Sequence, residues 1–361
     1  MNKKRIVIPC LLLLTVAGTW VMPGWQRDWQ VPGPRPTMVL DRALRVNTID
    51  TLVAALNDHY VFPAKAKDIE AFLRQRQQEG SYDGIRNGFK LAQQLTADIQ
   101  GVARDLHMKV RFAPGVVLPE EADGPAPASQ AQWEQQHNVV QRLFIRHTTT
   151  RHVVRVGRLG AHIGYLKISR FPDAFIIADR FAAAMDELAD TGGLIVDLRP
   201  NSGGDPQAVA LLVSYFVDQR TRLNDIWDRE TGVATQHWSE DKLAGKRYGG
   251  KKPILILVGR DTASAGEDFA YTMQSLKRAT VIGERTWGGA HPVSTHRIGE
   301  HFVAMIPSQR SISPITGTNW EGTGVIPDIL VAPDDAMAAA RQLMGRRLQS
   351  AHRGRLALQE K

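Results

Sequence analysis

Residues 194–204, LIVDLRPNSGG, decide the fold, because an unbroken apolar run leads directly into a polar, glycine-rich turn. Three branched apolar residues in succession are typical of a strand that is buried on both faces. The adjacent glycines Gly203 and Gly204 let the backbone approach a ligand closely and point N–H groups at it. The segment carries neither GxGxxG nor GxxxxGK[ST], so the alternatives are a ligand-facing loop and a simple strand-to-helix turn.

Strands and helices alternate on both sides of this stretch, which predicts an α/β domain with a buried sheet. A β-rich stretch then continues to residue 307, and a final helix is predicted from residue 334. The predicted strands are 163–168, 194–198, 254–258 and 280–282, and the predicted helices between them are 174–188, 206–217 and 265–276.

A second stretch, residues 254–267 (ILILVGRDTASAGE), also runs a strand into a turn of small residues before a helix. A serine at such a turn, Ser264, stands beside the positive end of a helix, where a nucleophile is exposed and activated. The GxSxG elbow pattern is not met, because Thr262 stands in place of its first glycine. Ser264 and Glu267 also fit a capping box, so helix capping is the alternative role of this serine.

A third stretch, residues 319–329 (NWEGTGVIPDI), predicts a rigid loop before an edge strand. Its carboxylate, Glu321, could orient a catalytic base, although a glutamate in a loop is more often solvated. The histidines at 291, 296 and 301 are five residues apart on predicted β structure, so they alternate faces and lack the spacing of metal ligands. We therefore expect no metal and no other cofactor.

The N-terminal part of the chain has a helical pattern. Apolar residues recur at helical spacing within residues 49–60, and further helices are predicted at 68–77 and 88–104. The predicted organisation is a helical N-terminal domain at 36–115, a Pro/Ala-rich linker at 116–138, an α/β catalytic domain at 139–345 and a basic C-terminal tail at 346–361.

Residues 1–25 have the pattern of a signal peptide or a signal anchor. Three basic residues, 3–5, precede the apolar stretch 6–22. We therefore expect export, with the protein either periplasmic or anchored to the cytoplasmic membrane and facing outward. The single cysteine, Cys10, lies in this leader, which excludes a disulfide framework and a cysteine nucleophile in the rest of the chain.

The composition is that of a soluble globular protein, with 43% apolar and 23% charged residues among 361. The formal net charge is +8, and three of these charges belong to the leader. The basic balance favours contact with anionic lipid over nucleic acid, since no zinc finger, RNA-binding aromatic signature or basic recognition helix is present.

These stretches together resemble the tail-specific, or C-terminal-processing, serine peptidases. The chain is most similar to the branch that contains the interphotoreceptor retinoid-binding protein repeats and the tricorn protease core. The resemblance spans residues 41–340. Its matching segments are DLRPNSGG (197–204), TASAGE (262–267), VIGERTWGGAHP (281–292), TGTNWEGTGVIPDI (316–329), NDHYVFP (57–63) and LTADIQGVARDLHMKVRF (95–112).

The resemblance implies a crotonase-like α/β catalytic domain preceded by a small helical bundle, with Ser264 as the nucleophile. It also implies an oxyanion hole made by the backbone N–H groups of Ala265 and of Gly203 or Gly204. Many relatives carry a PDZ domain between the helical part and the catalytic core. Too few residues separate positions 112 and 157 for such a domain, so none is expected.

The Ser–Lys dyad of the processing peptidases is not possible here, because Gly289 stands at the position of the lysine. The tricorn-like branch uses a histidine and a glutamate, which correspond to His107 and Glu321 in this chain. Leu106 replaces the serine that precedes the tricorn histidine, so one member of that relay is missing. His107 is the expected base, and its alternative role is that of a core or boundary histidine. With His107 as the base, the acylation rate is expected to rise with pH through an apparent pKa of roughly 6–7. His291 is expected to line the cleft or to be the alternative base.

Two functions from different classes follow from these observations. The favoured one is an exported serine-type endopeptidase that hydrolyses peptides or proteins through an acyl-enzyme on Ser264, with membrane association through its N-terminal segment. The alternative is a non-catalytic protein that binds an apolar ligand, such as a retinoid or a lipid, on the same scaffold. A pure carrier has no need of the combined set of Ser264, His107, Glu321 and the glycine turn. No nucleic-acid partner is expected, and the oligomeric state is left open.

Overall fold

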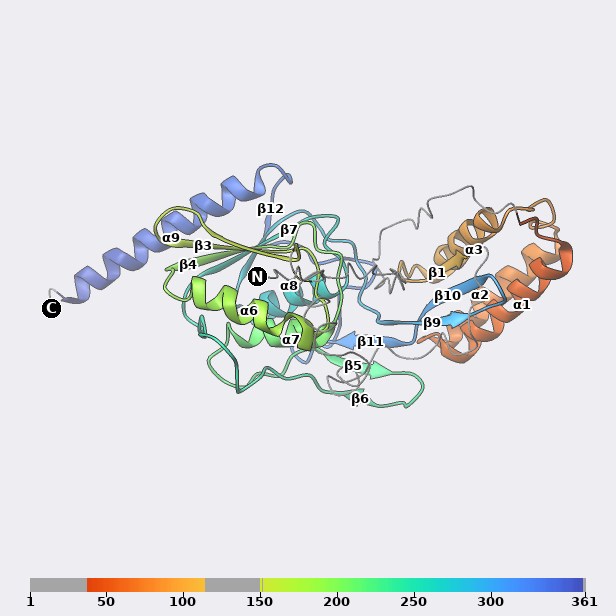
Figure 1. Ribbon diagram of the computed structural model, residues 1–361, viewed down its shortest axis with the longest axis horizontal. Helices are drawn as coiled ribbons and strands as arrows, with labels where there is room; N and C mark the ends of the chain where they lie inside the picture. The colour runs from red at the N-terminus through yellow and green to blue at the C-terminus, as the bar shows by residue number, and fades with distance from the viewer. Residues whose placement is uncertain (1–37, 114–149, 151, 360–361) are drawn as a thin grey trace, which may run out of the picture. The chain divides into compact units, whose positions relative to one another are not determined.

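In the computed structural model, which describes residues 38–113, 150 and 152–359, the central sheet has six strands in the order β12-β8-β7-β4-β3-β2 (Figure 1). Neighbouring strands are parallel except β2 and β3, which are antiparallel, so the sheet is mixed. The strands are β2 (Val154–Arg158), β3 (Ile163–Ile168), β4 (Gly193–Asp197), β7 (Ile254–Val258), β8 (Thr280–Gly283) and β12 (Ile329–Leu330).

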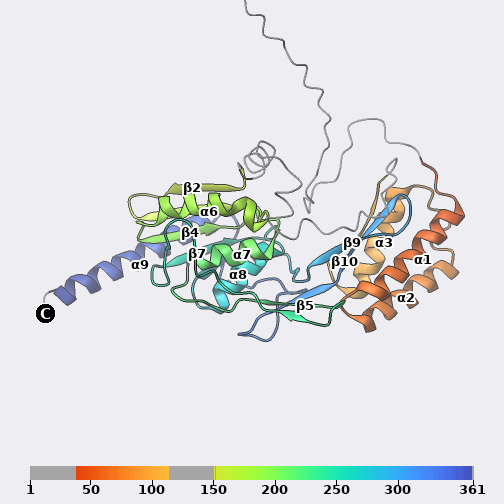
Figure 2. The same cartoon turned by 60° about the horizontal axis from the view of Figure 1, so that its bottom comes forward.

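Both faces of this sheet are covered, as the apolar runs predict. Strands β4 and β7 are buried along their whole length. Alternate residues of β4 face opposite sides, so Leu194 and Val196 pack with α6, α7 and α8, whereas Ile195 packs with α9. Figure 2 shows the ribbons of these helices beside the sheet. These helices are α6 (Ala174–Leu188), α7 (Pro206–Ser214), α8 (Ala265–Ser275) and α9 (Ala336–Gln359).

The N-terminal part contains three helices near the predicted positions: α1 (Arg42–His59), α2 (Pro63–Gln78) and α3 (Gly88–Ala103). The following strand, β1 (Lys109–Phe112), pairs with β10 (Phe302–Pro307), which pairs with β9 (Val293–Arg297). Residues of β10, including Phe302, enter the same apolar core as the three helices. The part predicted as 36–115 is thus completed by a hairpin from far along the chain. Alone, β1 would leave its backbone N–H and C=O groups without strand partners.

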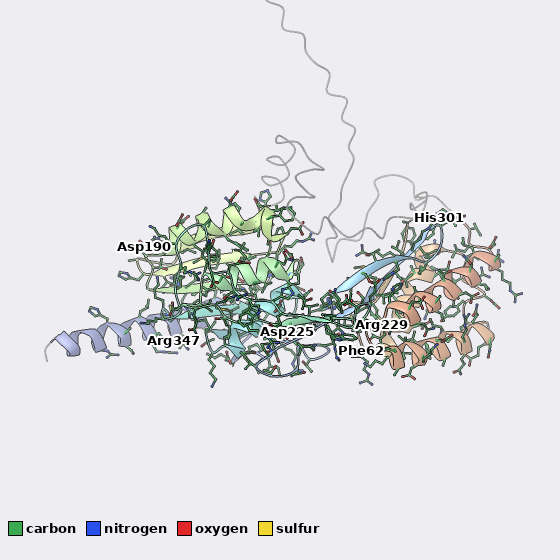
Figure 3. The ribbon with its side chains drawn as sticks, turned by 90° about the horizontal axis from the view of Figure 1, so that it is seen from below. Phe62, Asp190, Asp225, Arg229, His301 and Arg347 are labelled. Atoms are coloured by element: carbon green, nitrogen blue, oxygen red, sulfur yellow. The ribbon has the colours of Figure 1, made fainter. Side chains whose placement is uncertain are left out.

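A third sheet, with strand order β11-β5-β6, connects to these helices. Arg229, which directly follows β5, donates from Nη2 to the carbonyl oxygen of Asn57 at 2.6 Å and from Nη1 to that of Tyr60 (Figure 3). The end of α1 is therefore held by an arginine of the third sheet. The strands are β5 (Asp225–Asp228), β6 (Ala234–Thr235) and β11 (Gln309–Ile312).

Helix α9 runs through residue 345, so the predicted boundary between the catalytic domain and the tail at 346–361 falls inside a helix. Its buried residues Ala336, Ala340 and Met344 recur every four positions, which is the spacing of one helical face. The predicted leader at 1–25 and linker at 116–138 lie outside the described residues, as does most of the stretch that would hold a PDZ domain. Among the helices of the described part of the chain, none is long and apolar enough to span a membrane.

Candidate active site

Ser264 is the N-cap of α8, with backbone angles φ 51° and ψ −120°. Residues other than glycine rarely adopt positive φ, and such conformations cost on the order of 1–3 kcal/mol. Neighbouring hydrogen bonds hold this one in place. The Ala263 N–H donates to the carbonyl oxygen of Asn201 at 2.9 Å, and the buried Thr262 hydroxyl donates to that of Leu198 at 2.8 Å. The turn after β7 is thereby fixed against the turn after β4.

The glycine turn after β4 lies directly against Ser264. A Cβ built on Gly203 would lie 2.7 Å from Ser264 Cβ, and one built on Gly204 would overlap a neighbouring carbonyl group. Both residues also have positive φ, 96° and 140°, so glycine is required at both positions. The Gly203 N–H already donates to Asn201 Oδ1 at 2.9 Å. Within the described residues, the N–H groups of Gly204 and Ala265 donate to no acceptor, so these two can face a ligand.

Glu267, in the first turn of α8, is fully buried, and four donors converge on its carboxylate. Oε2 accepts hydrogen bonds from the N–H groups of Ser264 and Gly289, each at 2.9 Å. Oε1 accepts from the Gly288 N–H at 2.6 Å and from the Thr286 hydroxyl at 2.5 Å. Burial raises the pKa of Glu267 to about 7, although these hydrogen bonds act in the opposite direction. The sequence indicated only the capping contact, because bonds to a distant segment have no local signal.

His107 lies between α3 and β1, and only 2% of its surface is exposed. Its ring packs edge-on against Trp287, with the ring centroids 4.8 Å apart. A Cβ built on Gly289 would overlap His107 Cε1, so the imidazole fills the space beside the position expected for a lysine. Burial lowers the pKa of His107 to about 4, with Asp105 acting against this effect. This value lies below the apparent pKa of roughly 6–7 expected for the acylation rate, because burial disfavours the charged imidazole.

Three acid–base groups meet near this histidine. His291 Nδ1 lies 2.8 Å from Asp105 Oδ2 and 3.4 Å from Glu321 Oε2. Asp105 Oδ1 accepts the backbone N–H of His107 at 3.1 Å, and Glu321 Oε2 accepts that of Ala290 at 2.5 Å. Burial and the nearby Asp105 raise the pKa of Glu321 to about 9. The sequence did not single out Asp105, whose only signal was its position two residues before His107.

These three groups are also the residues that could hold a metal ion. The ligand atoms of Asp105, His291 and Glu321 all lie within 4.8 Å of one another. The 2.8 Å distance between His291 and Asp105 is that of a hydrogen bond, which a shared proton explains. The prediction of no metal considered only the spacing of the histidines, and it stays a prediction.

The predicted site residues thus form two groups, one around Ser264 and one around the buried imidazoles. Glu321 Oε2 lies 3.4 Å from His291 Nδ1. No hydrogen bond joins Ser264 Oγ to either histidine among the described residues, and the two groups are linked through the carboxylate of Glu267. Catalytic hydrogen bonds are often long before a substrate is bound and shorten when it binds.

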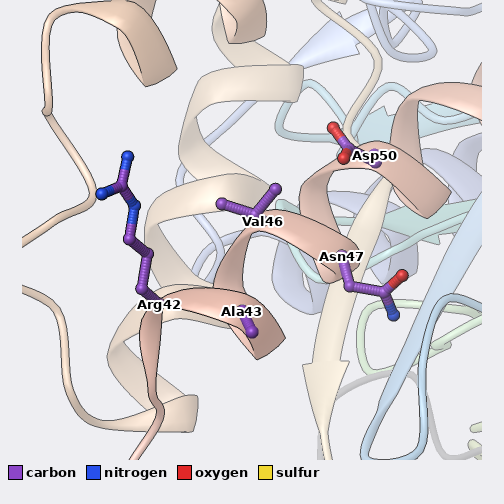
Figure 4. A pocket seen from close by; sticks show the side chains of 5 residues that line it. All are labelled: Arg42, Ala43, Val46, Asn47 and Asp50. Atoms are coloured by element: carbon purple, nitrogen blue, oxygen red, sulfur yellow. The ribbon is translucent and has the colours of Figure 1, made fainter.

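Two hollows lie near the described elements. A small one between α7, β5 and α8 contains Asp268, one turn after Ser264, and burial raises the pKa of Asp268 to about 6. Its apolar walls include Val209, Leu223 and Ile226. An open hollow along the first half of α1 contains none of the predicted site residues and is lined by Arg42, Ala43, Val46, Asn47 and Asp50 (Figure 4).

A serine in a strained conformation at a helix start, beside two backbone N–H donors and connected to a buried acid–base cluster, is the arrangement of a serine hydrolase. Two family models agree with this class. The model of peptidase family S41 matches residues 162–331, and the model of the N-terminal domain of peptidase S41 in eukaryotic IRBP matches residues 39–147. The chain belongs to peptidase family S41, whose members are serine-type peptidases.

Similar proteins carry related names. The carboxy-terminal-processing protease of Bartonella bacilliformis is 26% identical over 327 residues, which are 81% of this chain and 70% of that protein. The carboxyl-terminal-processing protease of Synechocystis is 32% identical over 134 residues, 36% of this chain and 29% of that protein. The tricorn protease of Thermoplasma volcanium is 27% identical over 177 residues, 48% of this chain and 16% of that protein. The matches to the last two therefore span less than a third of those relatives.

Solved structures show the same fold at low sequence identity. The tricorn protease structure superposes with a TM-score of 0.54 at 15% identity, covering 85% of this chain and 37% of that one. The structure of mature CPAF gives a TM-score of 0.53 at 13% identity, covering 81% of this chain and 94% of that one. The mixed α/β architecture is thus that of known S41 proteases.

Proposed function

We propose that this protein is an exported endopeptidase that hydrolyses peptide bonds through an acyl-enzyme on Ser264, in a crotonase-like catalytic domain. The observation that carries the proposal is the strained Ser264 packed against the Gly203–Gly204 turn, with its Cβ in the place that a side chain at 203 would need. A serine that served only as a helix cap would not require this contact or the positive φ.

The two open N–H groups supply the oxyanion hole. Ser264 Oγ attacks the scissile carbonyl carbon, and the carbonyl oxygen becomes negatively charged as the tetrahedral intermediate forms. The N–H groups of Gly204 and Ala265 donate to that oxygen, whereas Gly203 is already bonded to Asn201. Removal of one preorganised donor of this kind lowers kcat by about 10²–10³-fold.

His107 is the proposed base. Its ring lies beside Gly289, where any side chain would occupy the space of the imidazole. Burial keeps the imidazole neutral at neutral pH, so a ring nitrogen can take the Ser264 hydroxyl proton and return it to the leaving amine. A water molecule then hydrolyses the acyl-enzyme by the same proton path. Asp105 favours the imidazolium that forms, whereas the nearby His291 acts against it.

Two further parts of the proposal concern location and substrate. The basic and apolar residues 3–22 support export, to the periplasm or to the outer side of the cytoplasmic membrane. The processing proteases among the relatives support peptides or proteins as substrates. An apolar-ligand carrier is not favoured, because such a protein does not require the strained serine or the two open N–H donors.

Replacement of Ser264 by alanine tests this function directly. We expect Ser264→Ala to abolish peptide hydrolysis, since the variant has no Oγ, while lowering the free energy of unfolding by at most ~2 kcal/mol through loss of the cap. Ser202→Ala is the matched control, because Ser202 lies in the adjacent glycine turn and should keep wild-type turnover. Hydrolysis of an unstructured protein, followed by mass spectrometry, measures both. Wild-type turnover by Ser264→Ala would show that Ser264 acts only as a helix cap.

A further inference from the structure

We infer that Glu267 is a positioning residue of this active site, which sets the separation of Ser264 and His107 by accepting hydrogen bonds from the backbone beside each. The inference rests on the proposed function, because it assigns Glu267 a role only if those two residues react together.

One side of this connection reaches the nucleophile. Glu267 Oε2 accepts the N–H of Ser264 at 2.9 Å. Ser264 has a positive φ, which is an unfavourable conformation for a serine. An acceptor for its N–H holds φ at this value. The hydrogen bond therefore also fixes the direction of the Cα–Cβ bond that carries Oγ.

The other side reaches the histidine. Glu267 accepts the N–H groups of Gly288 at 2.6 Å and of Gly289 at 2.9 Å. The His107 ring lies against Gly289 so closely that even a Cβ there would overlap it. Movement of Gly289 would consequently move the surface on which the imidazole rests, and Trp287, on the same segment, packs against the ring edge.

The burial of this carboxylate separates positioning from simple capping. In a capping box the glutamate accepts one hydrogen bond, from the N-cap N–H. Glu267 is instead 0% exposed, and each of its two oxygens accepts two donors, the Thr286 hydroxyl among them. Placing a carboxylate in such a site is costly unless all its hydrogen bonds form. Glu267 lies where the Ser264 turn meets the Gly288–Gly289 segment, which is where a residue that holds the two together must be.

Two variants of the full-length chain test the inference. Glu267→Gln replaces an acceptor oxygen by an N–H donor that faces backbone donors, so the segments should separate. We expect kcat to fall by about 10²-fold, as a displacement of about 1 Å in a reacting pair does, with KM changed less than threefold. Thr286→Val removes one donor and should lower kcat roughly tenfold, while Thr286→Ser, which keeps the hydroxyl, should restore it.

The control is a helix cap far from the site. Asn87, the N-cap of α3, accepts the Lys90 N–H at 3.1 Å. Asn87→Ala should lower the unfolding midpoint but leave kcat unchanged. If folded Glu267→Gln or Thr286→Val keeps kcat within threefold of wild type, the positioning role is overturned. If the wild-type protein itself does not hydrolyse peptides, or does so without Ser264, the proposed function fails instead, so the two failures can be told apart.

Discussion

At the residue scale, the proposed site contains two buried side chains, His107 and Glu267, whose pKa values burial shifts in opposite directions. Removal from water disfavours a charged form, so the pKa of the imidazole falls to about 4 and that of the carboxylate rises to about 7. At neutral pH the imidazole is therefore an uncharged proton acceptor. The second buried imidazole, His291, is held differently, because its Nδ1 is hydrogen-bonded to Asp105.

The two histidines give opposite expectations for mutagenesis. We expect His107→Ala to lower kcat about as far as Ser264→Ala, because members of one catalytic relay fail together. His291→Ala should act mainly on KM, with kcat within about tenfold of wild type. Steady-state kinetics on one peptide substrate measure both. Near-normal kcat in His107→Ala together with lost activity in His291→Ala would make His291 the base, oriented by Asp105 as in a Ser–His–Asp triad.

Sequence reasoning singled out most residues of the proposed site, but it did not foresee their contacts. Ser264 and the glycine turn were found because a strand, a turn of small residues and a helix start leave a local signature. The contact of Glu321 with His291 was not foreseen, since a loop residue carries no signal of its partner. The depressed pKa of His107 was also missed, because burial depends on Trp287 and other residues far away in the sequence.

At the scale of elements, the segment between β8 and β9 is the part that joins the site together. It supplies Gly288 and Gly289 to Glu267, Trp287 to the His107 ring and His291 to Asp105. The segment contains no regular secondary structure, so its position depends on these contacts and not on strand pairing. A small steric change within it should therefore affect catalysis more than folding.

Gly289→Ala tests this expectation. The added methyl group would overlap the His107 ring, and we expect kcat/KM to fall by about 10²-fold while the free energy of unfolding falls by only about 1–3 kcal/mol. Gly101→Ala in α3 is the control, because nothing lies within 4 Å of its new Cβ, and it should leave activity unchanged. Full activity in Gly289→Ala would show that the ring need not occupy this place.

The elements themselves could be predicted to different degrees. Strands β3 and β7 have the predicted bounds, because an apolar run between turn residues defines both ends. The hairpin of β9 and β10 was predicted only as β-rich sequence. Its alternation shows that one face is buried, but it cannot show that Phe302 packs in the core of the N-terminal helices. Which distant segments pack together is decided by the whole fold and not by the local sequence.

At the scale of the whole molecule, the hairpin and Arg229 join the N-terminal helices to the rest of the described chain. His107 and Asp105 come from the helical side, whereas Ser264 and Glu267 come from the central sheet side. The site is therefore complete only in the folded molecule, and the protonation of its buried groups contributes to global stability.

The buried His107 makes a definite contribution to this pH dependence. Its folded-state pKa of about 4 lies below the ordinary value, so its neutral form stabilises the folded state fully above pH 6.5, and this contribution is lost as the pH falls toward 4. Between pH 7 and pH 4.5, we expect wild type to lose on the order of 2 kcal/mol more unfolding free energy than His107→Gln does. Urea titrations of both proteins at the two pH values measure the difference, and equal losses would contradict the burial of an uncharged His107.

The central claim, that Ser264 Oγ is the nucleophile, is tested most directly by locating a covalent adduct. The full-length protein would be treated with a fluorophosphonate, digested and analysed by peptide mass spectrometry, with Ser202→Ala and Ser264→Ala treated in parallel. The account predicts one phosphonylated residue, Ser264, in wild type and in Ser202→Ala, and no adduct in Ser264→Ala. A label on another residue, or undiminished labelling of Ser264→Ala, would contradict it.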